Sequence, residues 1–171
     1  TGYRLRAAIK RWESDRTTTV KRLERNLFKF PGDEPGEDPL VTAQQVNAAE
    51  HAIACLQTAL QSYNAMVLVS MDGNEVTLSY AIKSLVGAGR IEAIYRRALT
   101  TEPDTDYRGR RELTRREGEE RAVLAIAEPA LQTAYRTARK RAEAIRAAIA
   151  VANTTDIGIQ KFDMLEPAFF D

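Results

Sequence analysis

The sequence has few residues of the types that most often build chemical sites. It contains one cysteine, one histidine and one tryptophan among 171 residues. The single cysteine, Cys55, excludes a disulfide within the chain and is typical of a reducing compartment. The opening stretch TGYRLRAAIKRW also lacks the apolar core of a signal peptide. We therefore expect the protein in the cytoplasm.

A large net charge of either sign is also missing. Twenty-five Lys and Arg stand against 24 Asp and Glu, so overall charge favours neither nucleic-acid binding nor an acidic, disordered chain. The distribution is uneven, however. Residues 4–29 hold nine basic and three acidic side chains, whereas no basic residue occurs between Lys29 and Lys83. The length suits one domain, or a helical unit that associates with copies of itself.

Motifs of known catalytic sites are absent from the sequence. There is no phosphate-binding loop and no serine-centred elbow, and the only histidine, His51, has no clustered carboxylates nearby in sequence. Gly87 and Gly89 form a weak glycine signal inside a helical pattern. We expect no enzyme and no cofactor, while a site assembled on folding from distant Asp and Glu residues stays open.

Helical periodicity is the main signal that the sequence carries. Apolar residues at helical spacing predict a helix over 3–29, which Pro31 and Gly32 then stop. Residues 40–71 give the strongest pattern, because apolar positions alternate steps of three and four without a break, as in a coiled-coil seam. The seam consists of Val46, Ala49, Ile53, Leu56, Leu60, Tyr63 and Val67.

The 40–71 helix is unusual because its only formal charge is Glu50. A surface helix normally carries charge on its outer face, so we expect this helix to be covered on more than one side. Its Gln and Asn side chains can pair across an interface without the desolvation cost of ions. We predict a central helix that packs against its own chain and against a partner subunit.

The remainder of the chain predicts two more helices and several connections. Asp72 and Gly73 mark a turn before a helix over 77–100, in which Gly87 and Gly89 suggest a bend or a close helix crossing. A charged loop is expected at 101–121, residues 122–128 suit either strand or helix, and Pro129 opens an alanine-rich helix over 130–152. The apolar tail 157–171 should dock on a groove of its own chain or of a neighbour.

These elements predict an all-α fold of long antiparallel helices in a helical bundle, formed by one domain of residues 1–171 and assembled as a homo-oligomer. The 40–71 helix is expected at the centre of the assembly. The predicted function is that of a structural or interaction protein that binds copies of itself or an unidentified protein partner.

The order of several short motifs resembles the septicolysin-like family of small, predominantly helical bacterial proteins. The motifs are RLERNL, then GDEPGEDP, the long helix ending LQSYNAMVLV, the turn DGNEVTLSYAI, and AVANTTDI near the end. Glu34 to Pro39 match the family's acidic corner, and Asn153 to Thr155 match its closing Asn and paired Thr, although a Trp often found there is missing. The resemblance implies a helical fold and supplies no catalytic or binding residues.

The acidic corner at 33–38 has two interpretations. Its carboxylates could bind a hard cation such as calcium, but their spacing follows no known calcium loop. We favour a structural corner, because Glu37 and Asp38 precede a helix N-terminus and Pro39 suits the first helical position. His51 and Cys55 share a helix face at metal-ligand spacing, but two ligands do not make a zinc site, so we expect no metal.

Nucleic-acid binding is the main alternative function, because basic residues cluster in two helices. One cluster is the face of residues 4–29, and the other lies within 136–146. The candidate face of the second cluster consists of Arg136, Arg139, Lys140 and Arg141. Neither stretch has a recognised reading motif, and arginine-rich faces are commonly solvated outer faces of bundles.

A membrane-active, cytolysin-like role is a minor alternative. Residues 51–71 contain no Lys, Arg, Asp or Glu and are long enough to cross a bilayer. Their Gln, Asn, Ser and Thr residues make a poor membrane span, so a membrane partner is not expected.

Overall fold

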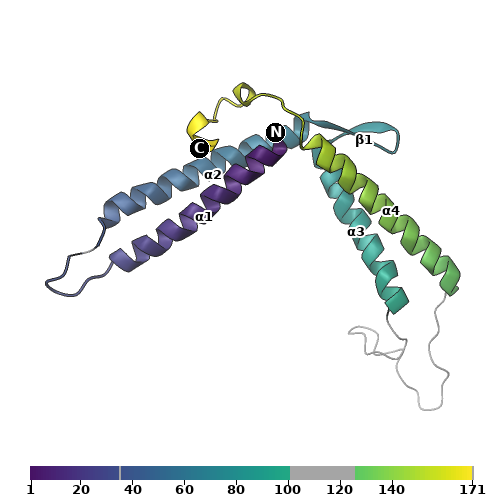
Figure 1. Cartoon of the computed structure of the whole chain (residues 1–171), viewed down its shortest axis with the longest axis horizontal. Helices are drawn as coiled ribbons and strands as arrows, with labels where there is room; N and C mark the ends of the chain where they lie inside the picture. Colours follow the sequence, from purple (N-terminus) through teal and green to yellow (C-terminus); the bar gives the residue numbers. More distant parts are fainter. Residues whose placement is uncertain (35, 101–125, 171) are drawn as a thin grey trace, which may run out of the picture. The chain divides into compact units, whose positions relative to one another are not determined.

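The computed structural model describes residues 1–34, 36–100 and 126–170, and it is mostly helical, which confirms the predicted all-α class in its coarse form (Figure 1). The elements in chain order are α1 (Gly2–Asn26), α2 (Pro39–Met66), β1 (Leu68–Met71), β2 (Asn74–Thr77), α3 (Leu78–Thr100), α4 (Glu128–Ala152), and the short 3-10 helices η1 (Ile159–Lys161) and η2 (Pro167–Phe170). The predicted loop at 101–121 and residues 122–125 lie outside the described ranges.

The chain divides into two compact units. The first comprises Thr1–Ser79 together with Ile149–Asp171, and the second comprises Tyr80–Ala148. The first unit therefore combines the beginning and the end of the sequence, and it contains α1, α2, the two strands and the tail.

The antiparallel pair of α1 and α2 forms the body of the first unit (Figure 1). The buried side chains of α1 are Leu5, Ala8 and Ile9, and those of α2 include Ala49, Ile53, Leu56 and Ala59. Alanine at several buried positions lets two helix backbones approach closely, while the leucine and isoleucine side chains fill the space between them. The apolar seam predicted on α2 is thus used inside the chain.

The corner between α1 and α2 is built as the sequence suggests. The predicted helix 3–29 ends earlier, at Asn26. Asp38 is the N-cap of α2, where its Oδ1 accepts a hydrogen bond of 2.8 Å from the amide of Leu40, and Pro39 is the first helical residue. The structural interpretation of the acidic corner explains these contacts.

A β-hairpin follows α2 and was not predicted. The helix expected to run to residue 71 ends at Met66, and β1 and β2 pair antiparallel, with Leu68 opposite Thr77. Asp72 and Gly73 both have positive φ, 52° and 80°, as the two central residues of a type I′ hairpin turn require. The predicted turn is therefore present, but it closes a hairpin instead of joining two helices directly.

Helices α3 and α4 supply the second unit (Figure 1). Helix α3 runs through Gly87 and Gly89 without a break, and a Cβ atom built at either glycine meets nothing within 4 Å. The expected close helix crossing at these glycines is therefore not present within the described chain. Helix α4 begins at Glu128, so Pro129 lies in its first turn as predicted.

The apolar C-terminal tail docks on the first unit, which confirms that prediction. Phe162 and Phe169 are buried, each 7 % exposed. The carbonyl oxygen of Phe169 accepts hydrogen bonds from Arg11 Nη2 at 2.9 Å and from Trp12 Nε1 at 3.0 Å. The Phe169 ring also meets the rings of Trp12 and His51 edge to face, with centroids 6.4 Å apart in both pairs.

Replacing Phe169 with alanine should lower the free energy of unfolding by about 3 kcal/mol, because it removes a buried aromatic side chain. Urea denaturation followed by the fluorescence of Trp12 measures the loss. The matched control is Phe28→Ala, since Phe28 is 86 % exposed and its removal should change stability little. Equal effects of the two substitutions would show that the tail is not docked in solution.

Candidate functional site

The buried side chain of Tyr63 joins three segments of the first unit. Tyr63 lies in the last turn of α2 and is fully buried. Its hydroxyl donates to the carbonyl oxygens of Ala152 and Thr155, at 2.8 and 2.9 Å, and Gly2 lies beside the Tyr63 ring. Burial raises the pKa of Tyr63, although the Gly2 amide and the charge of Arg6 act in the opposite direction.

Asn153 completes this junction at the end of α4. It is 1 % exposed, and its Nδ2 donates to the carbonyl oxygen of Ile149 at 2.8 Å. Its backbone carbonyl accepts a 3.4 Å hydrogen bond from the amide of Tyr3. Gly2 lies so close that a Cβ atom there would clash with Asn153 Oδ1 and approach the Tyr63 ring to 2.7 Å. Only glycine fits between these two side chains.

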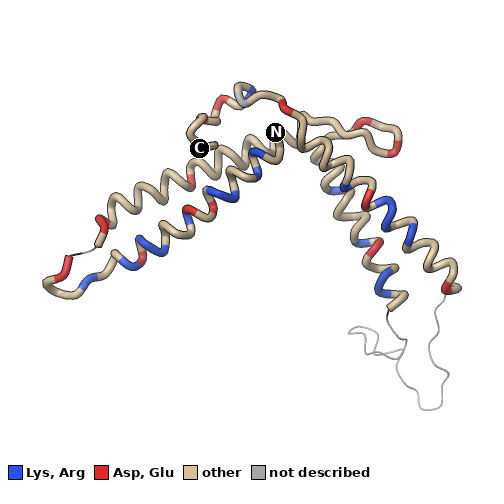
Figure 2. The backbone as a smooth tube through the Cα atoms, in the orientation of Figure 1, with Lys and Arg blue, Asp and Glu red and all other residues tan. Residues whose placement is uncertain are grey.

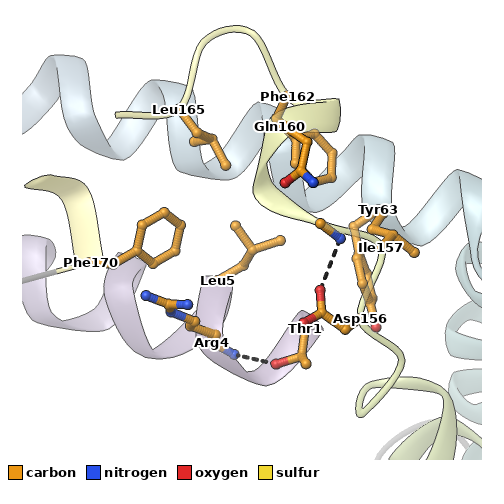
Figure 3. A pocket seen from close by; sticks show the side chains of 11 residues that line it. Thr1, Arg4, Leu5, Tyr63, Asp156, Ile157, Gln160, Phe162, Leu165 and Phe170 are labelled. Carbon is orange, nitrogen blue, oxygen red and sulfur yellow. Dashed lines mark hydrogen bonds between the residues drawn. The ribbon is translucent and has the colours of Figure 1, made fainter. Parts of the chain in front are cut away.

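A pocket of about 510 Å³ lies next to the junction, between the start of α1, the end of α2 and the tail (Figure 3). Its lining residues are Thr1, Arg4, Leu5, Tyr63, Asp156, Ile157, Gly158, Gln160, Phe162, Leu165 and Phe170. This volume is within the range of about 300–1,000 Å³ that is usual for small-molecule sites. The pocket is therefore a candidate ligand site.

The pocket has one cationic and one anionic side chain. The guanidinium carbon of Arg4 lies 4.8 Å from the centre of the Phe170 ring, a cation–π contact. Asp156 Oδ1 accepts a hydrogen bond of 2.9 Å from the amide of Gly158, which has a positive φ of 76°. In Figure 3, Arg4 and Phe170 are on one side of the pocket, and Asp156 and Gln160 are on the other.

Sequence reasoning missed this pocket because its residues come from segments far apart in the chain. The AVANTTDI motif was the one available signal, since Asn153, Thr155 and Asp156 lie at the junction and at the pocket wall. The sequence alone gave these residues no role.

The predicted seam residues on α2 are enclosed within the first unit. Ala49, Ile53, Leu56, Tyr63 and Val67 are buried, and the other two seam positions are partly buried. The opposite side of α2 is exposed in the single chain, including Gln57 and Gln61. The partner subunit expected over α2 stays a prediction.

The predicted basic face lies on α4, where Arg136, Arg139 and Lys140 share one side of the helix and Arg141 lies on another. Arg139 Nε forms an ion pair with Glu143 at 2.9 Å, and this hydrogen bond raises the pKa of Arg139. Figure 2 shows the basic residues along α1 and α4 and their absence from α2.

Several basic residues of α1 are occupied by contacts within the chain. Arg16 pairs with Glu50 at 3.2 Å, and Arg22 pairs with Glu37 at 2.6 Å. These contacts reduce the number of α1 side chains that are free to meet phosphates.

The candidate metal ligands do not converge. Glu37 contacts Arg22 and Asp38 caps α2, so two of the four carboxylates in the acidic corner have structural partners. Cys55 Sγ lies 3.7 Å from His51 Nε2, as expected for residues one helical turn apart. Within residues 1–34, 36–100 and 126–170, no group of three or more His, Cys, Asp or Glu side chains is arranged to hold a metal ion.

Comparison with protein-family models, with curated proteins and with solved structures finds no match to this chain. The resemblance to the septicolysin-like family therefore stays a prediction based on the sequence motifs. Among the helices that the structure describes, none combines the length and apolar character needed for a bilayer crossing.

Replacing Tyr63 with phenylalanine should lower the free energy of unfolding by about 2 kcal/mol, because buried carbonyl groups lose their hydrogen-bond donor. A raised pKa in the folded state also means that the unfolded chain loses its proton first as pH rises. As pH rises above 10.0, the ordinary pKa of tyrosine, the free energy of unfolding of the wild type should therefore fall. The free energy of unfolding of Tyr63→Phe should fall less steeply over the same pH range.

Urea denaturation between neutral pH and alkaline pH tests both expectations. The control is Tyr3→Phe, since Tyr3 is 48 % exposed and should leave both stability and its pH dependence unchanged. If the free energy of unfolding changed with pH in the same way for the wild type and for Tyr63→Phe, the Tyr63 hydroxyl would not be buried in solution.

Proposed function

We propose that the protein is a helical interaction module that binds a second copy of itself through one face of α3. The observation that carries this proposal is a row of exposed apolar residues on that helix. Tyr80, Ile91 and Ile94 are 56 %, 49 % and 64 % exposed in the single chain. Exposed apolar side chains that gather on one face commonly mark an interaction site.

The row follows coiled-coil spacing along α3. Its members alternate steps of four and three, so they share one helix face, and we call them the α3 row: Tyr80, Ser84, Gly87, Ile91, Ile94 and Ala98. The face is distinct from the buried side of the helix, which includes Leu78 and Ala81. The exposed members of the α3 row therefore offer an apolar surface to a second helix.

A second copy is the partner that best fits this face. The α3 row contains no charge, so two copies related by a two-fold axis bring no like charges together within the row itself. Gly87 lies in the middle of the row, and a Cβ atom built on it would meet nothing within 4 Å. Because glycine has no side chain, another helix can cross closely at this position. Ile91 and Ile94 then pack beside the crossing point.

This proposal moves the interface away from α2, the helix that the sequence favoured. The apolar seam of α2 is covered by its own chain, and the exposed side is rich in small and amide side chains such as Asn47, Ala54 and Gln61. Burying these residues removes less apolar surface from water than burying isoleucine and tyrosine. Self-association through α3 is the stronger of the two alternatives.

A reducing compartment such as the cytoplasm remains part of the proposal because of the single cysteine.

Sedimentation across a dilution series tests self-association. The wild type should form a dimer, and the double variant Ile91→Asp/Ile94→Asp should raise the dimer Kd by about 100-fold or more, because two charges would enter an apolar contact. Two controls keep the outcome specific: Leu40→Asp, an exposed apolar site in the first unit, and Ala54→Asp, on the outer side of α2.

A wild type that is monomeric at every concentration would refute self-association. If Ala54→Asp disrupts the dimer while the α3 variant does not, the interface lies on α2. Circular dichroism of each variant establishes that its helices are intact.

Nucleic-acid binding is a second candidate function, favoured by the exposed positions of Arg136, Arg139 and Lys140 on one side of α4.

If the protein has this function, its binding to duplex DNA should weaken steeply as the salt concentration rises. The variant Arg136→Gln/Lys140→Gln should lower the slope of log K against log salt by about 2, one for each lost phosphate contact. The control Lys83→Gln should leave the slope unchanged. Absence of DNA binding at low salt would exclude this function.

A further inference from the structure

We propose that the pocket between α1, α2 and the tail binds a small monocarboxylate with an apolar body, and that Arg4 receives the carboxylate. This site is independent of the proposed self-association, because it lies in the first unit and uses none of the α3 residues. The proposal rests on the placement of one cation, on the apolar walls and on the hydrogen bonds already made around the pocket.

Arg4 is prepared to receive an anion. Its guanidinium carbon lies 4.8 Å from the centre of the Phe170 ring, a contact that favours this position of the group. The planar N–H donors of a guanidinium match the two oxygens of a carboxylate. No carboxylate of the described residues lies within ion-pair distance of Arg4. An anionic ligand would supply the missing partner.

The backbone at the start of α1 does not offer an alternative anion site. The amide of Tyr3 donates to the carbonyl oxygen of Asn153, and the amide of Arg4 donates to Thr1 Oγ1. A phosphate at a helix N-terminus is usually held by free amides of this kind. Because these amides are occupied, the side chain of Arg4 must make the contact with the anion.

The other lining residues restrict the class of anion. Leu5, Phe162 and Leu165 give the pocket apolar walls, and Phe162 is buried. These walls favour a ligand with a hydrocarbon or aromatic body. Asp156 adds a negative charge to the same lining, which disfavours a doubly charged group such as a phosphate monoester. A singly charged carboxylate next to an apolar body satisfies both conditions.

Isothermal titration of the full chain with octanoate tests the site. Octanoate should bind, and octanol, octylamine and octyl phosphate should each bind more weakly. Arg4→Gln should weaken octanoate binding by about 10-fold and leave octanol binding unchanged, because only the charge-assisted hydrogen bonds are lost. Arg6→Gln is the matched control, since Arg6 is an exposed arginine two residues away that does not line the pocket.

A second variant tests the location of the apolar body. Leu165→Gln should weaken octanoate and octanol to a similar degree, because it changes the wall and not the charge. Equal binding of octanoate and octanol to the wild type would overturn the proposal, as would an Arg4→Gln variant with unchanged affinity for octanoate. If Arg4→Gln fails to fold, the comparison of the four ligands on the wild type still decides the question.

Discussion

The first unit depends on one buried hydroxyl group. Tyr63 at the end of α2 donates to the carbonyl oxygens of Ala152, at the end of α4, and of Thr155, and its ring lies against Gly2 at the start of α1. Three segments distant in sequence therefore meet at one side chain. Asn153 and Gly2 fill the remaining space so closely that a larger residue at position 2 does not fit. The pocket beside Tyr63 has its shape because this junction fixes the positions of α1 and of the tail.

The helices were predictable because their apolar residues repeat at helical spacing. This repeat shows which side of each helix is apolar, whatever segment packs against that side. The corner was also predictable, since Asp38 and Pro39 have local roles that depend only on their own helix. The β-hairpin was missed because Val67, Leu68 and Val69 continue the apolar pattern of α2. Their preference for strand becomes effective only when the Asp72–Gly73 turn brings β2 alongside.

The candidate site could not be predicted because it depends on tertiary contacts. Arg4 and Phe170 are at opposite ends of the sequence, and no spacing rule relates them. The missing charge on α2 predicted a helix covered on more than one side, and the chain itself covers only the side that faces α1 and the tail, since Gln57 and Gln61 are exposed. It did not identify what covers the helix. The sequence predicted contacts with the chain itself and with a partner subunit. The chain supplies α1 and its own tail, and the partner subunit stays a prediction.

The first unit is discontinuous, because residues 149–170 complete a structure that residues 1–79 begin. Contacts such as that between Trp12 and Phe169 close a loop of almost the whole chain, and loops of this length slow folding. During synthesis, α1 and α2 can pair long before the tail leaves the ribosome. Until then, the rings of Trp12 and His51 that Phe169 contacts in the folded chain have no cover from the tail.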